Sequence, residues 1–102
     1  MKKKTFRKQS RYVLVTDALR GIVWGELIKQ DPKTRTCVLK NARHCFCYTC
    51  HPEAKGILGL ATKGPQTGSK VGPLVDRHEL FYEKITDCTA EANQAWLDAT
   101  WA

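Results

Sequence analysis

Short runs of β-branched and apolar residues, separated by turn signals, constrain the fold of this chain most strongly. Four such runs fill its first half: 12–17 (YVLVTD), 20–28 (RGIVWGELI), 35–40 and 42–49. The stretch 18–21 and the pair Asp31-Pro32 are typical of tight turns between them. The first half of the chain therefore predicts four short strands, the first two forming a hairpin.

A helix signal follows these strands. Pro52, directly after His51, suits the first position of a helix, and Glu53 suits the positive end of its dipole. The pattern predicts a short helix through Ala61, because Gly64-Pro65 ends any helix that begins there.

The last third of the chain returns to strand signals and closes on a helix. One or two further strands are expected at 71–75 and 78–86. Thr89 suits an N-cap and Glu91 suits a first helical turn, which predicts a helix from there to about Ala99.

These elements fit a small antiparallel β sandwich or barrel of five to seven strands, with one short middle helix and a C-terminal helix. A chain of 102 residues fits one domain, and residues 12–102 are expected to form it. No run approaches the roughly 18 apolar residues of a membrane span. The basic start of the chain lacks the apolar core of a signal peptide, so no membrane role and a cytoplasmic location are expected.

The charge of +7 is unevenly distributed. Residues 1–11 contain six bases and no acid, and they are expected to form a flexible arm: Lys2, Lys3, Lys4, Arg7, Lys8 and Arg11. Residues 33–70 contain seven bases and one acid, whereas residues 71–102 contain two bases and six acids. A basic arm can neutralise phosphates, which predicts DNA or RNA binding, although such an arm also suits a solubilising tail.

A cluster of soft metal ligands lies after the fourth predicted strand. Cys47 and Cys50 have the spacing of a zinc knuckle, and Cys45 and His51 complete a possible four-ligand set. No cofactor is expected, and zinc is the one candidate that this set could hold. The alternative interpretation is ordinary packing of cysteine as a small apolar residue, and a redox role for the Cys47 and Cys50 pair is a weaker one.

A glycine-rich segment, GPQTGSKVGP at 64–73, superficially resembles a phosphate loop. The segment contains Gly-Ser-Lys, whereas the phosphate loop of an NTPase contains Gly-Lys followed by Ser or Thr, so the segment does not have the sequence of an NTPase. It can still contact an anion beside the basic middle of the chain, although it also suits a plain surface connection at the edge of the sheet. The candidate anion-contacting residues are Arg43, His44, Lys63 and Lys70.

Covalent catalysis has little support in this sequence. The only two serines are Ser10, in the basic arm, and Ser69, in the glycine-rich segment, and neither lies in a nucleophile-elbow sequence. The sequence therefore predicts a protein that binds rather than one that catalyses.

Several motifs together resemble a family of small uncharacterised proteins encoded by tailed phages and prophages. They are YVLVTDALRGIVWGEL at 12–27, VLKNAR at 38–43, GILGLATKGP at 56–65 and ITDCT at 85–89. The resemblance covers roughly residues 11–102. It implies a compact β-rich domain in the cytoplasm of an infected bacterium, and a short protein that acts on host machinery by binding.

These observations give one expected function and two alternatives. The expected function is a non-enzymatic host-interaction or counter-defence protein that sequesters a nucleotide-like anion in a homo-oligomer. The alternatives are a nucleic-acid-binding accessory protein that uses the basic arm, and a small zinc-binding module. Trp24 is expected in the core, while Trp101, with part of the C-terminal helix, is expected near a subunit interface.

Overall fold

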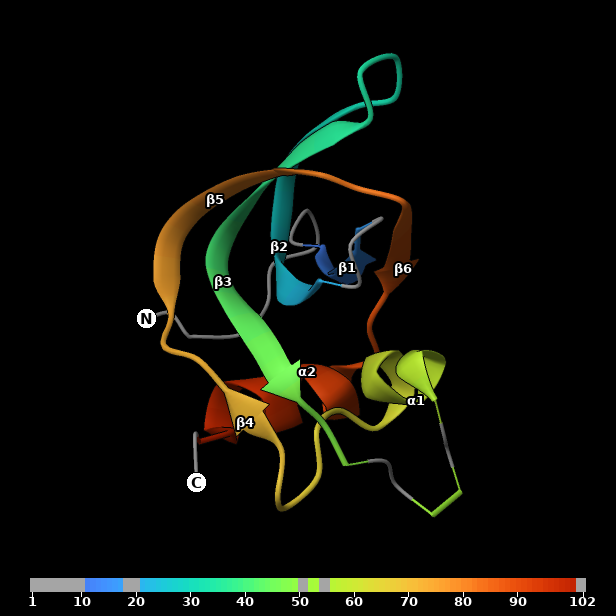
Figure 1. Ribbon diagram of the computed structural model, residues 1–102, viewed down its shortest axis with the longest axis vertical. Coiled ribbons are helices and arrows are strands. Elements are labelled where there is room, and N and C mark those ends of the chain that lie inside the picture. The colour runs from blue at the N-terminus through green and yellow to red at the C-terminus, as the bar shows by residue number, and fades with distance from the viewer. Residues whose placement is uncertain (1–10, 18–20, 50–51, 54–55, 101–102) are drawn as a thin grey trace, which may run out of the picture.

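The computed structural model describes residues 11–17, 21–49, 52–53 and 56–100 (Figure 1). Its six strands are β1 (Tyr12–Thr16), β2 (Ile22–Asp31), β3 (Thr36–Cys47), β4 (Lys70–Val71), β5 (Val75–Phe81) and β6 (Lys84–Asp87). Its two helices are α1 (Ile57–Thr62) and α2 (Ala90–Asp98). The predicted mainly β, antiparallel fold with a middle helix and a C-terminal helix is confirmed. The sheet is open rather than closed into a barrel.

The strands follow the order β4-β3-β2-β1-β6, and β5 also pairs with β3. The long strand β3 makes this branching possible, because its first half pairs with β5 and its last residues pair with β4. The chain then passes from β5, beside β3, to β6, beside β1 (Figure 1). Because the consecutive strands β5 and β6 lie at opposite sides of the sheet, the sheet is strongly curved, and its concave side is its inner face.

Three local predictions were wrong. The one or two strands expected at 71–75 and 78–86 are three, β4, β5 and β6, because the chain leaves β3 for β1 at Tyr82 and Glu83, whose N–H groups donate to the carbonyls of Arg35 and Thr16. The runs 35–40 and 42–49 form one strand, because Asn41 adopts a φ of 53° and the strand continues through it. Asparagine tolerates this left-handed region better than most residues. Helix α1 begins at Ile57 instead of Pro52, and it follows Gly56 with a φ of 86°.

The C-terminal helix agrees with its prediction. Thr89 is the N-cap of α2, and its hydroxyl oxygen accepts a hydrogen bond from the backbone N–H of Ala92 at 3.1 Å. The same hydroxyl donates to the carbonyl of Thr62 at 2.6 Å, which ties the start of α2 to the end of α1.

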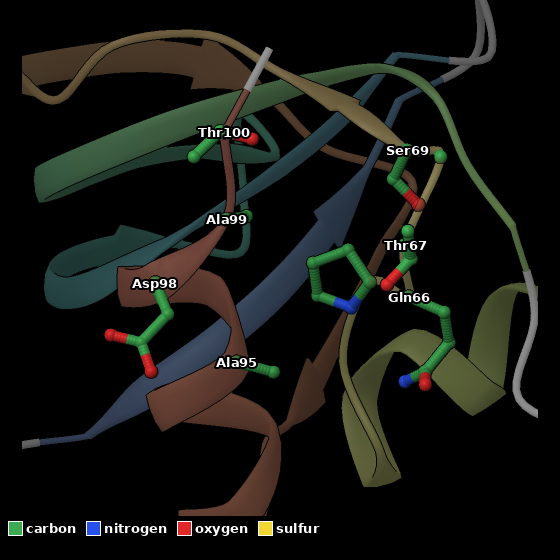
Figure 2. A pocket seen from close by; sticks show the side chains of 9 residues that line it. Gln66, Thr67, Ser69, Ala95, Asp98, Ala99 and Thr100 are labelled. Atoms are coloured by element: carbon green, nitrogen blue, oxygen red, sulfur yellow. The ribbon is translucent and has the colours of Figure 1, made fainter. Parts of the chain in front are cut away.

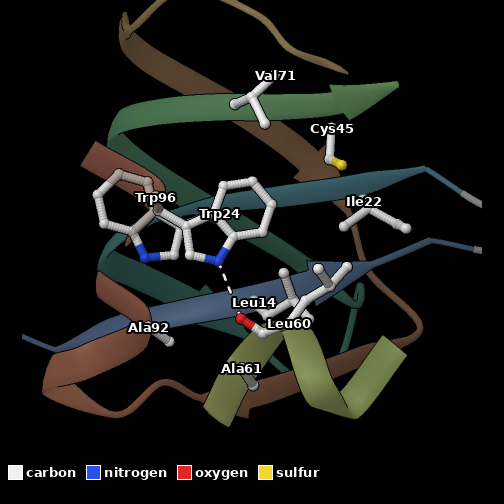
Figure 3. Packing of buried hydrophobic residues seen from close by; sticks show 9 residues of the cluster. All are labelled: Leu14, Ile22, Trp24, Cys45, Leu60, Ala61, Val71, Ala92 and Trp96. Atoms are coloured by element: carbon white, nitrogen blue, oxygen red, sulfur yellow. Dashed lines mark hydrogen bonds between the residues drawn. The ribbon is translucent and has the colours of Figure 1, made fainter. Parts of the chain in front are cut away.

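A tryptophan pair forms the centre of the core between the sheet and the helices (Figure 3). The rings of Trp24 on β2 and Trp96 on α2 stack with centroids 6.1 Å apart, and both side chains are fully buried. Each indole N–H has a partner: Trp24 donates to Asn93 Oδ1 at 2.9 Å, and Trp96 donates to the Leu60 carbonyl at 3.0 Å. The prediction of Trp24 as a core residue is confirmed.

A second apolar cluster fills the inside of the curled sheet. Its buried members are Val13, Val15, Val23, Cys37, Leu39, Ala42 and Tyr82. The helices α1 and α2 contribute to the tryptophan cluster on one face of the sheet, whereas no helix residue belongs to this second cluster. No helix among the described residues is long and apolar enough to span a membrane.

Candidate functional site

A cavity of about 550 Å³ lies between the glycine-rich segment and the C-terminal end of α2 (Figure 2). One wall comes from the glycine-rich segment, and the other comes from the last turn of α2 and the residues after it. The lining residues are Pro65, Gln66, Thr67, Gly68, Ser69, Ala95, Asp98, Ala99 and Thr100.

Close packing of backbone positions the first wall. Gly64 has a φ of 83°, and a Cβ atom there would lie 2.5 Å from the Ala95 Cβ atom, so only glycine allows this approach to α2. Gln66 Nε2 then donates to the Gly64 carbonyl at 3.0 Å. Ser69 is buried, and its Oγ accepts a hydrogen bond from the backbone N–H of Thr49 at 2.8 Å. The segment is therefore fixed to both α2 and the end of β3.

Arg43 positions the second wall. Its buried guanidinium donates to the carbonyls of Trp96 at 2.8 Å and Ala99 at 2.9 Å, where α2 ends. Its Nε also donates to the Gly72 carbonyl at 2.7 Å, on the chain segment that leaves β4. Burial lowers the pKa of Arg43. A cation at this place satisfies the last carbonyls of the helix and complements the negative end of its dipole.

The polar side chains of the described lining residues are hydroxyls, an amide and one carboxylate. Asp98 is the only ionisable residue among them, and its Oδ1 accepts a hydrogen bond from Gln94 Nε2 at 3.1 Å. In Figure 2 Thr67 lies on the opposite wall, while the Asp98 carboxylate points away from the glycine-rich segment. This chemistry suits a neutral ligand rich in hydroxyl groups, or the sugar part of a larger one, better than a bare phosphate.

The structure does not bring the four predicted anion-contacting residues together. Arg43 lies at the C-terminal end of α2, whereas Lys63 Nζ lies 3.4 Å from Glu91 Oε1 in the first turn of the same helix. Nine helical residues separate these ends by about 13 Å. Lys70, on β4, pairs with Cys47 across the ladder and directly follows the lining residue Ser69.

His44 lies on the other face of the sheet, opposite Val23 of β2. Its ring stacks on Phe46 at 5.7 Å and meets the edge of His78 on β5 at 5.0 Å. Burial and the neighbouring His78 lower the pKa of His44, while Asp17 acts in the opposite direction.

The predicted metal ligands fall partly outside the described residues, where Cys50 and His51 lie. Cys45 is buried and Cys47 is exposed, and the Cys45 thiol donates to the Cys47 carbonyl at 3.5 Å. Burial raises the pKa of Cys45 to about 11, which disfavours the thiolate that a metal needs. The described part of the chain contains no group of three residues that could hold a metal ion, and the four-ligand zinc set stays a prediction.

The predicted basic arm also lies outside the described residues, except for Arg11. The Arg11 Nε lies 2.6 Å from Asp87 Oδ1, so this guanidinium forms an exposed ion pair at the edge of β6. Trp101, which was expected near an interface, lies outside the described residues as well.

Comparison with known proteins places the chain in a family. A family model described as a domain of unknown function (DUF6948) matches residues 10–96. The chain belongs to this family. No curated protein and no solved structure matches it. DUF6948 carries no assigned activity, so the function of this member has to be inferred from its own sites.

Sequence reasoning identified one wall of the cavity in this DUF6948 protein and missed the other. The glycine-rich segment has a recognisable pattern, whereas no local pattern marks Asp98 or Thr100. Asp98 reads locally as an ordinary helix-end residue, and only the packing of α2 against Gly64 places it opposite Thr67.

A second cavity, of about 760 Å³, lies beside the start of α1. Its lining includes Tyr48 together with Ile57 and Leu58, of which Leu58 is 63 % exposed. Asp17 and Lys84 are charged residues of the same lining. Sequence reasoning gave no signal for this cavity.

Proposed function

We propose that the protein is a non-enzymatic, phage-derived binding protein that sequesters a small nucleotide-like ligand and acts as a homo-oligomer against a host process. The observation that carries the proposal is the cavity between the glycine-rich segment and α2. Its volume of about 550 Å³ is within the range of small-molecule sites, and hydrogen-bonding side chains line both of its walls.

The lining groups favour the ribose part of such a ligand. The Asp98 carboxylate is a hydrogen-bond acceptor that suits sugar hydroxyls, which is the role that acidic residues have toward ribose in dinucleotide-binding proteins. Thr67 adds a hydroxyl that can donate or accept. Lys70, which follows the lining residue Ser69 in the sequence, is the residue that we propose for the phosphate part of the ligand.

The same lining supports binding over catalysis. Its nine described residues include no histidine, cysteine or lysine, and the Ser69 hydroxyl oxygen already accepts a hydrogen bond from the backbone N–H of Thr49. A serine nucleophile needs an adjacent base, and within the described part of the lining the Asp98 carboxylate alone could serve as one.

Titration calorimetry with an ADP-ribose-type nucleotide and with a cyclic dinucleotide tests the proposal. We expect heat with at least one of them, and at least tenfold weaker binding for Asp98→Ala. Asp31→Ala, which removes a carboxylate from the β2–β3 turn, serves as the matched control and should bind normally.

The absence of heat with both probes would overturn the proposed ligand class. Equal affinity of Asp98→Ala and the unaltered protein would overturn the site. Binding only to an oligonucleotide, lost when residues 1–10 are removed, would favour the nucleic-acid alternative instead.

A further inference from the structure

Strand β5 (Val75–Phe81) has one free edge. Within the described residues it pairs with β3 alone, in a regular antiparallel register from Phe81 opposite Thr36 to Val75 opposite Ala42. Its other edge carries backbone N–H and C=O groups with no described strand beside them, and such an edge can accept a strand from another chain.

The two charged side chains on the outer face of β5 have no oppositely charged residue opposite them on β3. Arg77 lies opposite Lys40, a residue of like charge, and Glu79 lies opposite the buried Val38. Neither Arg77 nor Glu79 forms an ion pair or a side-chain hydrogen bond with another described residue. Like charges directly opposite each other are unfavourable, so an acidic neighbour on the free side of Arg77 would be stabilising.

The two ends of the same face are apolar and open to solvent. Phe81 is 71 % exposed and Val75 is 40 % exposed. Along this face the order is therefore apolar, basic, acidic, apolar. When a second copy of the strand runs antiparallel beside the first, each base can lie opposite an acid and each apolar residue opposite an apolar one.

We propose that two copies of the chain associate through β5, antiparallel and related by a two-fold axis at His78. In this register Arg77 lies opposite Glu79 of the second copy, and each such pair occurs twice. Val75 lies opposite Phe81 of the second copy, which covers the most exposed apolar side chain of the strand. The inference rests on the homo-oligomeric part of the proposed function and names the surface that forms it.

The charges also select this register over its neighbours. A shift by two residues in one direction places Arg77 opposite Arg77 of the second copy, and a shift in the other direction places Glu79 opposite Glu79. Both arrangements put like charges together, whereas a shift by one residue would exchange the two faces of the strand. The same charges discourage pairing with unrelated strands, which is how edge strands avoid aggregation.

Charge reversal tests this interface. Arg77→Glu and Glu79→Arg should each weaken self-association at least tenfold, measured by sedimentation equilibrium at low salt. The double variant R77E/E79R restores opposite charges in the same register and should associate normally. An equimolar mixture of the two single variants should form a mixed dimer, because each supplies the charges that the other lacks.

The variants are designed to keep the fold intact. Glu at position 77 would face Lys40 within the same chain, so Arg77→Glu replaces a like-charge pair by an opposite one. Lys29→Glu makes the same charge change on exposed β2 and should leave association unchanged. Thermal unfolding of each variant confirms that a monomeric species is folded.

The outcomes separate the surface from the function. A dimer that withstands both single reversals would overturn the β5 pairing and leave a homo-oligomer of another kind. A protein that is monomeric at all concentrations tested would overturn both the pairing and the homo-oligomer. Calorimetry on the monomeric single variants tests the ligand cavity separately, because no lining residue lies on β5.

Discussion

Replacing Arg43 by methionine tests whether this buried arginine holds the end of α2 in place. Methionine keeps the length and apolar character of the stem but removes every donor. The carbonyls of Gly72, Trp96 and Ala99, now bonded at 2.7–2.9 Å, would then lose their donors. A buried acceptor without a partner costs about 1–3 kcal/mol.

The summed effect on the free energy of unfolding is large for a protein of this size. Water can reach Ala99, which is only partly buried, so we expect a loss of about 3–5 kcal/mol for Arg43→Met. Each kcal/mol corresponds to about 4–8 °C in a domain of this length, so the melting temperature should fall by at least about 12 °C. Urea unfolding followed by tryptophan fluorescence, with thermal melts by circular dichroism, measures both quantities.

Two further variants give the comparison. Lys29→Met removes an exposed cation and should change the unfolding free energy by less than about 0.5 kcal/mol. Arg43→Lys keeps the charge beside the helix end but has no planar fork, so an intermediate loss is expected. If Arg43→Met loses less than about 1 kcal/mol, the guanidinium is not what anchors α2, and the account of the second wall is refuted.

Two further predictions concern titratable groups. Among the described cysteines, Cys47 should react first with a maleimide in a Cys50→Ser background. Burial raises the pKa values of the other three thiols, to about 11 for Cys37 and Cys45 and to about 12 for Cys88. Equally fast labelling of Cys45 in the folded protein would contradict this prediction. Burial and His78 lower the pKa of His44 in the folded state. As the pH falls below about 6.5, His44 is therefore protonated in the unfolded chain before it is protonated in the folded one. The unfolding free energy should decrease in this pH range and stay constant at higher pH. His44→Gln should flatten this dependence in urea titrations between about pH 7.5 and 5.5, and an unchanged slope would exclude His44 as its source.

Local patterns were enough to predict most of the fold. The β-branched and apolar runs 12–17 and 20–28 predicted a hairpin, and the structure contains it as Tyr12–Thr16 paired with Ile22–Asp31. Thr89 predicted the start of α2 because an N-cap works through residues only three positions away. Signals of this kind depend on neighbours in sequence, so they remain valid whatever the rest of the chain does.

The failures arose where a contact between distant segments decides the conformation. Asn41 separates two runs that read as two strands, yet pairing with both β2 and β5 carries one strand through it. Arg43 and His44, as neighbours in a strand, point to opposite faces of the sheet, as the period of two in a strand requires. This period could not show that the C-terminal end of α2, more than fifty residues later, supplies the acceptors for Arg43.

The position of Arg43 also changes what this residue contributes to binding. Its donors are directed to the main chain on both sides, to Gly72 after β4 and to Ala99 after α2, so the guanidinium joins the segments that carry the two walls of the cavity. Loss of Arg43 would therefore weaken ligand binding by letting Asp98 move relative to Ser69, not by removing an anion contact. Raising the salt concentration should then leave the affinity of the unaltered protein for the sugar part of the ligand nearly unchanged, because screening acts on exposed charges more than on a buried guanidinium.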